Sequence, residues 1–135
     1  MDVLTKKQRS RCMAAVHAEH TKPEIIVRRA ISQMGYRYRL HCTNLPGKPD
    51  VVFSGMRKVI FVHGCFWHRH RCKKGRSTPR SNMEFWNRKL SENVVRDRRH
   101  RRELKKLGWQ ILVLWECQVR HEAALMKRLE KFLDG

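Results

Sequence analysis

The chain lacks any long apolar run. Its 135 residues contain no stretch of eighteen or more apolar residues, and its mean hydropathy is −0.68. A helix that crosses a bilayer needs about 20 such residues, so we expect no membrane span. The first ten residues, MDVLTKKQRS, also lack the hydrophobic segment of a signal peptide. The sequence therefore predicts a cytoplasmic protein of a prokaryote or its phage.

Acidic residues are scarce. The chain has 12 Asp and Glu residues against 31 Lys and Arg, which gives a formal net charge of +19 and a pI near 10.8. An enzyme acting on a small metabolite has no need of this excess, whereas a protein that displaces counterions from a phosphate backbone does. Nucleic acid is therefore the expected partner. By itself, the composition fits an enzyme and a protein that merely coats its polyanion equally well.

A disulfide framework is not expected, because five cysteines are an odd number in a chain without a secretion signal. Two of them lie with three histidines in the segment 61–72, FVHGCFWHRHRC. Thiolate and imidazole are the ligands that zinc prefers, and four of them make a closed, structural site. The expected zinc ligands are Cys65, His70, Cys72 and Cys117. The alternative is that these cysteines are simply core residues. The expected free thiols are Cys12 and Cys42.

Hydrophobic periodicity predicts one α/β domain over residues 1–135, with a basic N-terminal arm over residues 1–20. Capping-box patterns at 21–24 and 81–84 predict the starts of two helices. The expected elements are a helix over 21–34, strands over 36–40, 50–53 and 58–63, a helix over 81–108, a strand over 109–115 and a helix over 121–133. The strand over 109–115 is expected to be buried on both faces. This order predicts a mixed central sheet flanked by helices.

A strand that begins at Asp50 favours catalysis over simple binding. In restriction-type nucleases a strand aspartate holds Mg²⁺, and the next strand carries a Glu-x-Lys pair. Here the end of the next strand reads Phe61-Val62-His63 and has neither residue of that pair. His63 and His68 are not needed for zinc, so they can contact a phosphate or transfer a proton to or from Mg²⁺-activated water. Glu24 is a candidate to orient a histidine, or else only a capping residue.

Several motifs together resemble the very-short-patch-repair (Vsr) mismatch endonucleases, in register from Arg9 to the last helix. The similar segments are PGKPD at 46–50, FVHGCFWH at 61–68, EFW at 84–86, NV at 93–94, RDRR at 96–99 and WEC at 115–117. The resemblance implies a restriction-endonuclease-like core with a structural zinc site. It also implies a Mg²⁺-dependent enzyme that initiates very short patch repair. Such an enzyme nicks double-stranded DNA 5′ of the thymine in a T:G mismatch left by deamination of 5-methylcytosine.

The resemblance further implies roles for individual residues. Asp50 would bind Mg²⁺ through its carboxylate and Val62 through its backbone carbonyl. His68 would be the general base, with Glu24 in support, and His63 would lie beside the phosphate. The residues that it places at the DNA are Phe66, Trp67, Trp86, Lys89, Asn93 and Met13. The three aromatic residues among them would intercalate beside the mismatch.

Two departures from the family pattern stand out. Val62 replaces the family's usual Thr, which matters little for a contact through the backbone, and the basic loop 73–80 differs, which leaves the sequence context open. The alternatives are a Vsr-like nuclease of other specificity and a non-catalytic nucleic-acid-binding module held together by zinc. A monomer is expected, because an asymmetric mismatch does not call for two-fold symmetry. The associated methyltransferase, the stringency for T:G, the divalent ion used in the cell and any downstream repair proteins stay open.

Overall fold

The computed structural model describes residues 22–134. The N-terminal arm, with Met13 and Cys12, lies outside the described residues. Within residues 22–134, no helix is long and apolar enough to cross a membrane.

The centre of the fold is a four-stranded mixed sheet with the strand order β1-β2-β3-β4. Its strands are β1 (Arg39–Leu40), β2 (Val51–Phe53), β3 (Lys58–His63) and β4 (Gln110–Trp115). The first three strands pair antiparallel, and β4 pairs parallel with β3. The helix α3 (Met83–Lys106) forms the crossover between the two parallel strands. The expected mixed sheet flanked by helices is confirmed.

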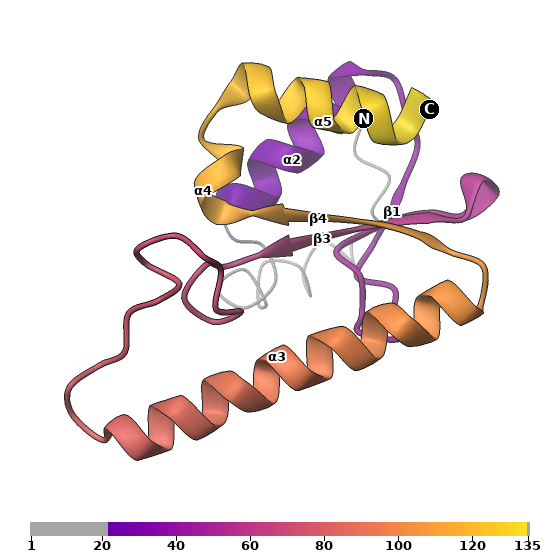
Figure 1. The fold of residues 1–135 in the computed structure, drawn as a ribbon. Coiled ribbons are helices and arrows are strands. Elements are labelled where there is room, and N and C mark those ends of the chain that lie inside the picture. The colour runs from indigo at the N-terminus through magenta and orange to yellow at the C-terminus, as the bar shows by residue number, and fades with distance from the viewer. Residues whose placement is uncertain (1–21, 135) are drawn as a thin grey trace, which may run out of the picture.

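Helices cover both faces of this sheet. On one face lie α2 (Lys22–Gln33), the short α4 (Glu116–Val119) and α5 (Glu122–Asp134), whereas α3 lies along the other face (Figure 1). Side chains alternate along β2 and β3 as a pleated strand requires. Val51 and Ile60 join the core under α2 and α5, while Val52 and Val59 pack in a smaller core with Leu104 of α3. The two inner strands are therefore buried on both faces.

The helix α3 is much longer than the sheet that it covers. Its 24 residues span about 36 Å at 1.5 Å per residue. Its C-terminal part packs under the sheet, and its N-terminal part extends past the sheet edge, next to the loop that follows β3 (Figure 1). Met83 and Phe85 near its start are half-exposed, with 50% and 52% of their surfaces accessible. The fold thus presents an apolar helix end away from the core.

Four expected features differ in the structure. The strand over 36–40 shortens to Arg39–Leu40, and the rings of Tyr36 and Tyr38 pack edge-on against Phe53. The second capping box does not form, since Asn82 occupies the cap position in a left-handed conformation without a side-chain hydrogen bond. Both faces of the edge strand β4 pack against a core, but the strand is only partly buried, since Leu114 alone is fully buried. The helix α4 was not expected.

Candidate active site

Antiparallel pairing of β2 and β3 brings Asp50 to the end of the sheet where His63 lies. Asp50 directly precedes β2, His63 is the last residue of β3, and Val51 faces Ile60 in the register. Oδ2 of Asp50 accepts a hydrogen bond of 2.7 Å from the backbone N–H of Val62. The neighbouring strand therefore fixes the position of this carboxylate.

Asp50 belongs to a group of three side chains that could hold a cation. Ligand atoms of Glu24, His41 and Asp50 all lie within 4.8 Å of one another. Oε1 of Glu24 lies 2.8 Å from Nε2 of His41, and Glu24 is only 2% exposed. Burial raises the pKa of Asp50 to about 6, and the nearby charge of Glu24 also raises it, whereas the hydrogen bond from Val62 opposes the shift. Such crowding of buried carboxylates favours binding of a positive charge.

The second group contains the two histidines that zinc does not need. The rings of His63 and His68 stack with centroids 3.8 Å apart and planes 7° apart. Nδ1 of His68 lies 2.5 Å from Oδ2 of Asp97 on α3. Burial lowers the pKa of His63 to about 3, so this ring is neutral at physiological pH. His68, held at Nδ1 by a carboxylate, has the arrangement of a general base that works through Nε2.

Two residues of these groups were not expected at the site, namely His41 and Asp97. The support for His68 that we expected from Glu24 comes from Asp97 instead, because Glu24 is engaged with His41. In the sequence Asp97 is surrounded by arginines and reads as a local partner for them. Its signal is helical spacing: it stands seven residues after Leu90 and seven before Leu104, both of which are fully buried on α3.

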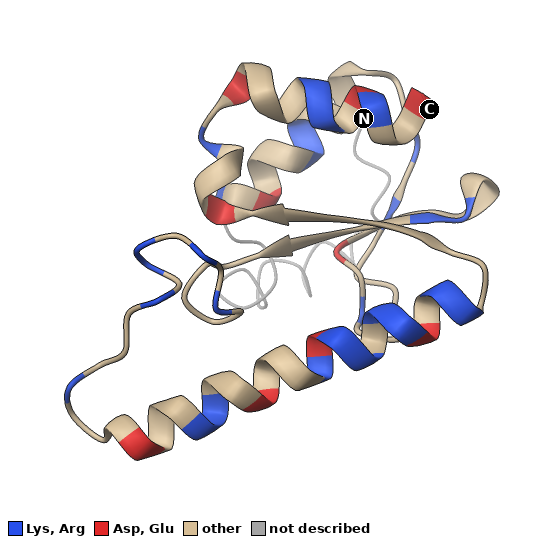
Figure 2. Cartoon of the chain, viewed as in Figure 1, with Lys and Arg blue, Asp and Glu red and all other residues tan. Residues whose placement is uncertain are grey.

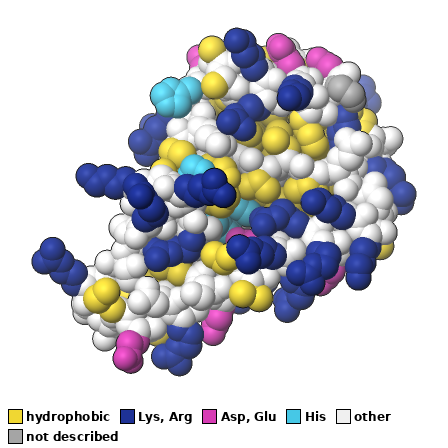
Figure 3. Space-filling view, viewed as in Figure 1, with side chains coloured by type: hydrophobic (Ala, Val, Ile, Leu, Met, Phe, Trp, Pro, Cys, Tyr) yellow, Lys and Arg dark blue, Asp and Glu magenta, His cyan; other side chains and the backbone are white. Residues whose placement is uncertain are grey.

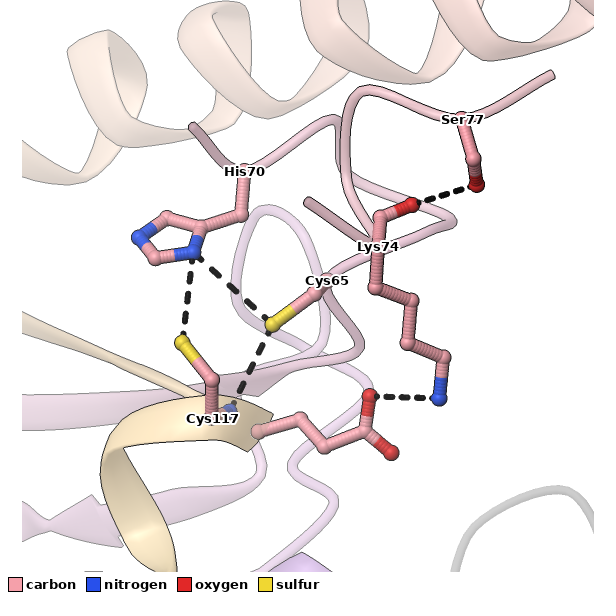
Figure 4. A network of polar contacts seen from close by, with 6 residues as sticks. Cys65, His70, Lys74, Ser77 and Cys117 are labelled. Atoms are coloured by element: carbon pink, nitrogen blue, oxygen red, sulfur yellow. Dashed lines mark hydrogen bonds and ion pairs between the residues drawn. The ribbon is translucent and has the colours of Figure 1, made fainter. Parts of the chain in front are cut away.

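The four expected zinc ligands form the third group. Their ligand atoms also lie within 4.8 Å of one another. Nδ1 of His70 lies 3.8 Å from Sγ of Cys65 and 3.4 Å from Sγ of Cys117 (Figure 4). The backbone N–H of Gly75 lowers the pKa of Cys72 to about 6, whereas burial raises that of Cys65 to about 12. The short helix α4 places Cys117 next to the loop after β3, so ligands that are far apart in the sequence come together in one group.

The basic loop after this group is folded against it. Gly75 packs directly against the backbone of His70, where an added Cβ would lie 2.0 Å from the carbonyl oxygen. Nζ of Lys74 lies 3.1 Å from Oε1 of Glu116 on α4, and Oγ of Ser77 donates to the Lys74 carbonyl (Figure 4). Another hydrogen bond, of 2.5 Å, runs from Arg69 to the carbonyl of Ser77. The loop 73–80 is therefore attached to the candidate metal site.

The three aromatic residues expected at the DNA come together next to these groups. Phe66 stacks on Trp67 with centroids 5.1 Å apart, and Trp86 of α3 lies 5.7 Å from Phe66 and 5.8 Å from Trp67. Trp67 is 46% exposed. Nδ2 of Asn93 donates a hydrogen bond of 3.1 Å to the carbonyl of Trp67, which fastens the loop to α3. Lys89 lies exposed on the same helix.

A cavity of about 580 Å³ joins the chemical groups to the aromatic residues. It lies between the end of the sheet and α3. The side chains that matter for chemistry on its wall are those of Asp50, His63, His68, Asp97, Phe66 and Trp67. Lysine and arginine side chains crowd this face, with histidine between them (Figure 3). The cavity thus combines carboxylates, imidazoles and stacking surfaces within a basic face.

Comparison with known proteins identifies the family. The model of the family described as DNA mismatch endonuclease Vsr matches residues 1–74. The chain is 40% identical over 132 residues to the type II nicking enzyme V.NmeAIP of Neisseria meningitidis, covering 98% of this chain and 94% of that protein. It is 40% identical over 139 residues to the DNA mismatch endonuclease Vsr of Escherichia coli, covering 99% and 88%. The chain belongs to the Vsr family.

A third relative agrees with this assignment. The type II nicking enzyme V.XorIIP of Xanthomonas oryzae is 42% identical over 133 residues, which cover 98% of this chain and 97% of the relative. As a Vsr-family protein, the chain is a DNA endonuclease and acts on phosphodiester bonds. The cavity with Asp50 and the paired histidines is the place in the structure where such chemistry fits.

Replacing Asp97 with Asn is expected to slow the endonuclease by about 10²- to 10⁴-fold. The amide keeps the shape but not the charge that fixes the His68 tautomer and stabilises its protonated form. The rate of nicking under single-turnover conditions is the measurement. Glu103→Gln, at a half-exposed carboxylate of the same helix, is the control and should stay close to wild type. A wild-type rate in Asp97→Asn would contradict the role of the pair.

Proposed function

We propose that this Vsr-family protein nicks one DNA strand on the 5′ side of the thymine in a T:G mismatch, and thereby initiates very short patch repair. The observation that carries the proposal is the shared cavity. Phe66 and Trp67, which can stack on bases, line the same cavity as Asp50 and His68, which can act on a phosphate. A site that senses a distorted base step is therefore adjacent to a site that can cleave the backbone. One chain suffices for an asymmetric mismatch.

The donor set at Asp50 fits Mg²⁺, the catalytic ion in this proposal. Mg²⁺ prefers oxygen ligands and is held by one or two carboxylates together with phosphate oxygens. Glu24 supplies a buried carboxylate and Asp50 a partly buried one, and Val62, beside Asp50, is the residue whose backbone carbonyl would add a third oxygen. When bound, Mg²⁺ supplies positive charge to the phosphate oxygens and lowers the pKa of water. Burial raises the pKa of Asp50, and a cation bound there would favour the charged carboxylate again.

The proton transfer in this proposal uses His68. Its Nδ1 faces Asp97, so Nε2 accepts the proton of the attacking water while Asp97 stabilises the imidazolium that forms. His63 is stacked under His68 and is neutral, so it can donate one hydrogen bond to the phosphate without adding charge. The two histidines therefore divide the work, one for proton transfer and one for holding the phosphate.

The donor set of Cys65, His70, Cys72 and Cys117 fits a structural zinc ion. Three thiols and one imidazole within 4.8 Å of one another are a common tetrahedral zinc set without an open position. The segment between these ligands carries Phe66, Trp67 and His68. A closed metal site would hold the loop rigid, so that its aromatic side chains stay directed at the DNA while its histidine stays in the cavity.

Discrimination of the mismatch follows from the cost of deforming DNA. A mispaired step stacks weakly, so opening it costs less than opening a paired step, where unstacking takes a few kcal/mol. Stacking on the aromatic residues returns about 1–3 kcal/mol per base. Polar side chains of α3, Lys89 and Asn93 among them, would add direct contacts to base edges. The balance favours insertion at the mismatch over insertion at a matched site.

The test compares duplexes that differ only in T:G or C:G at one position, with each strand end-labelled separately. With Mg²⁺ present, we expect a nick in the thymine strand directly 5′ of the mispaired T, and at least about a hundredfold slower cleavage of the matched duplex, equivalent to about 3 kcal/mol. Several flanking sequences define the context. Equal cutting of both duplexes would keep the nuclease and reject the mismatch role. Tight binding without cleavage would favour a binding module.

A further inference from the structure

One arginine of α3 differs from its neighbours in its surroundings. The run 96–102 contains five arginines, and Arg96, Arg98, Arg99 and Arg102 are exposed. Arg101 is half-buried and lies four residues after Asp97 and three before the fully buried Leu104. This spacing places it on the stripe of the helix that faces the sheet. Figure 2 shows the concentration of basic residues in this part of α3.

Arg101 also lines the catalytic cavity together with Asp50, His63 and His68. Its positive charge contributes to the lowered pKa of His63, which is consistent with a position near that ring. In the part of the chain that the structure describes, the ion pairs of α3 join Asp97 to His68 and Arg99 to Glu103. Arg101 takes part in neither pair. Among the described residues, its guanidinium is therefore a cation in the cavity without a carboxylate partner.

The negative charges in and near the cavity explain why a cation is needed there. Carboxylates of Asp50 and Asp97 lie on its wall, and a phosphodiester that enters adds a negative charge that grows in the transition state. Of the other cations on the wall, Lys74 is paired with Glu116 and Lys48 is exposed. A guanidinium has planar, paired donors that match two phosphate oxygens.

We propose that Arg101 binds the non-bridging oxygens of the scissile phosphate and stabilises the charge that develops on them during cleavage. The inference rests on the proposed endonuclease function at this cavity. It separates Arg101 from the exposed arginines of the same run, which would contribute to DNA affinity alone. The residue is thus a catalytic group supplied by α3, in addition to those at the strand ends.

The experiment compares Arg101→Ala and Arg101→Lys with Arg102→Ala, which removes the same charge from an adjacent, exposed position. Single-turnover nicking at saturating protein is expected to fall about 10²- to 10³-fold in Arg101→Ala. Arg102→Ala should keep the wild-type rate, weaken binding and lower the salt dependence by about one phosphate contact. Wild-type rates in Arg101→Ala, or equal losses in both alanine variants, would overturn the proposal.

A second readout separates direct contact from a structural role. Phosphorothioate substitution at the scissile phosphate replaces one non-bridging oxygen in each diastereomer. The measured quantity is the ratio of the nicking rate of the unmodified substrate to that of the phosphorothioate. If Arg101 contacts one of these oxygens, this ratio for sulfur at that oxygen should fall at least about tenfold in Arg101→Lys, because lysine does not reproduce the paired donors. Unchanged sulfur effects in both diastereomers would refute the contact. Arg101→Lys keeps the charge and the aliphatic stem, so it serves even where the alanine variant fails to fold.

The outcome is independent of the mismatch assignment. The variants are assayed on whichever duplex the wild-type protein nicks, so cutting of matched DNA would reject T:G specificity and leave the Arg101 comparison intact. Absence of any nicking by the wild-type protein would overturn both proposals. A reduced nicking rate in Arg101→Ala, together with an altered phosphorothioate effect in Arg101→Lys, supports the role of Arg101 even where the mismatch role fails.

Discussion

Replacing Asp50 with Asn is expected to reduce nicking by at least about 10³-fold and to leave DNA binding nearly unchanged. The amide oxygen can still accept the hydrogen bond that Asp50 now accepts from the Val62 N–H at 2.7 Å, so the end of the sheet should keep its shape. The variant loses the negative oxygen that would hold Mg²⁺. The decisive comparison is the single-turnover rate with Mg²⁺ against the dissociation constant for the same duplex without it.

The control for Asp50→Asn is Glu130→Gln, which removes one negative charge from an exposed position on α5. This variant should nick and bind as the wild type does. Removal of a carboxylate next to the phosphate can strengthen binding slightly, because repulsion is lost. Residual cleavage by Asp50→Asn within tenfold of the wild type would show that the carboxylate is not the metal ligand, and loss of binding would indicate that the substitution disrupts the site as a whole.

The strand-end residues of the candidate site could be predicted because their signals are local. Asp50 directly precedes one strand and His63 ends the next one along the chain, and the antiparallel pairing of these strands in the structure brings them together. His41 and Asp97 could not be predicted in the same way. They reach the site from a loop and from α3, and the contacts of 2.8 Å to Glu24 and 2.5 Å to His68 depend on how these segments pack. Tertiary packing, which no local pattern encodes, decides which carboxylate supports which histidine.

The predicted elements agree with the structure where the hydrophobic periodicity extends over many residues. The helix α3 and the strand β3 were expected close to their observed bounds, since each has many residues in phase. Short or edge elements deviated. The two residues of β1 and the four of α4 are too few to show a period. Yet α4 carries Cys117, so an element without a sequence signature completes the candidate metal site.

Replacing Cys72 with Ala is expected to abolish zinc binding and to leave most of the chain unfolded at 37 °C. A structural zinc site contributes apparent binding free energies of about 10–16 kcal/mol in zinc-finger peptides, which is comparable to the whole stability of a small domain, about 5–15 kcal/mol. Cys72 is informative because it is only partly buried, whereas Cys65 is 1% exposed. Its loss leaves little cavity, so destabilisation would report the metal and not packing. Zinc content per chain and thermal unfolding are the measurements.

The matched control for Cys72→Ala is Cys42→Ala. Cys42 is also partly buried, packs against the smaller core with Leu45 and lies outside the four-ligand group. That variant should keep one zinc per chain and lose about 1 kcal/mol or less, as is usual away from special features. Treatment of the wild type with a chelator should reproduce the unfolding of Cys72→Ala. A Cys72→Ala protein that is stable, free of zinc and active would refute the structural role, because the loop that carries Trp67 and His68 would then hold its shape without the metal.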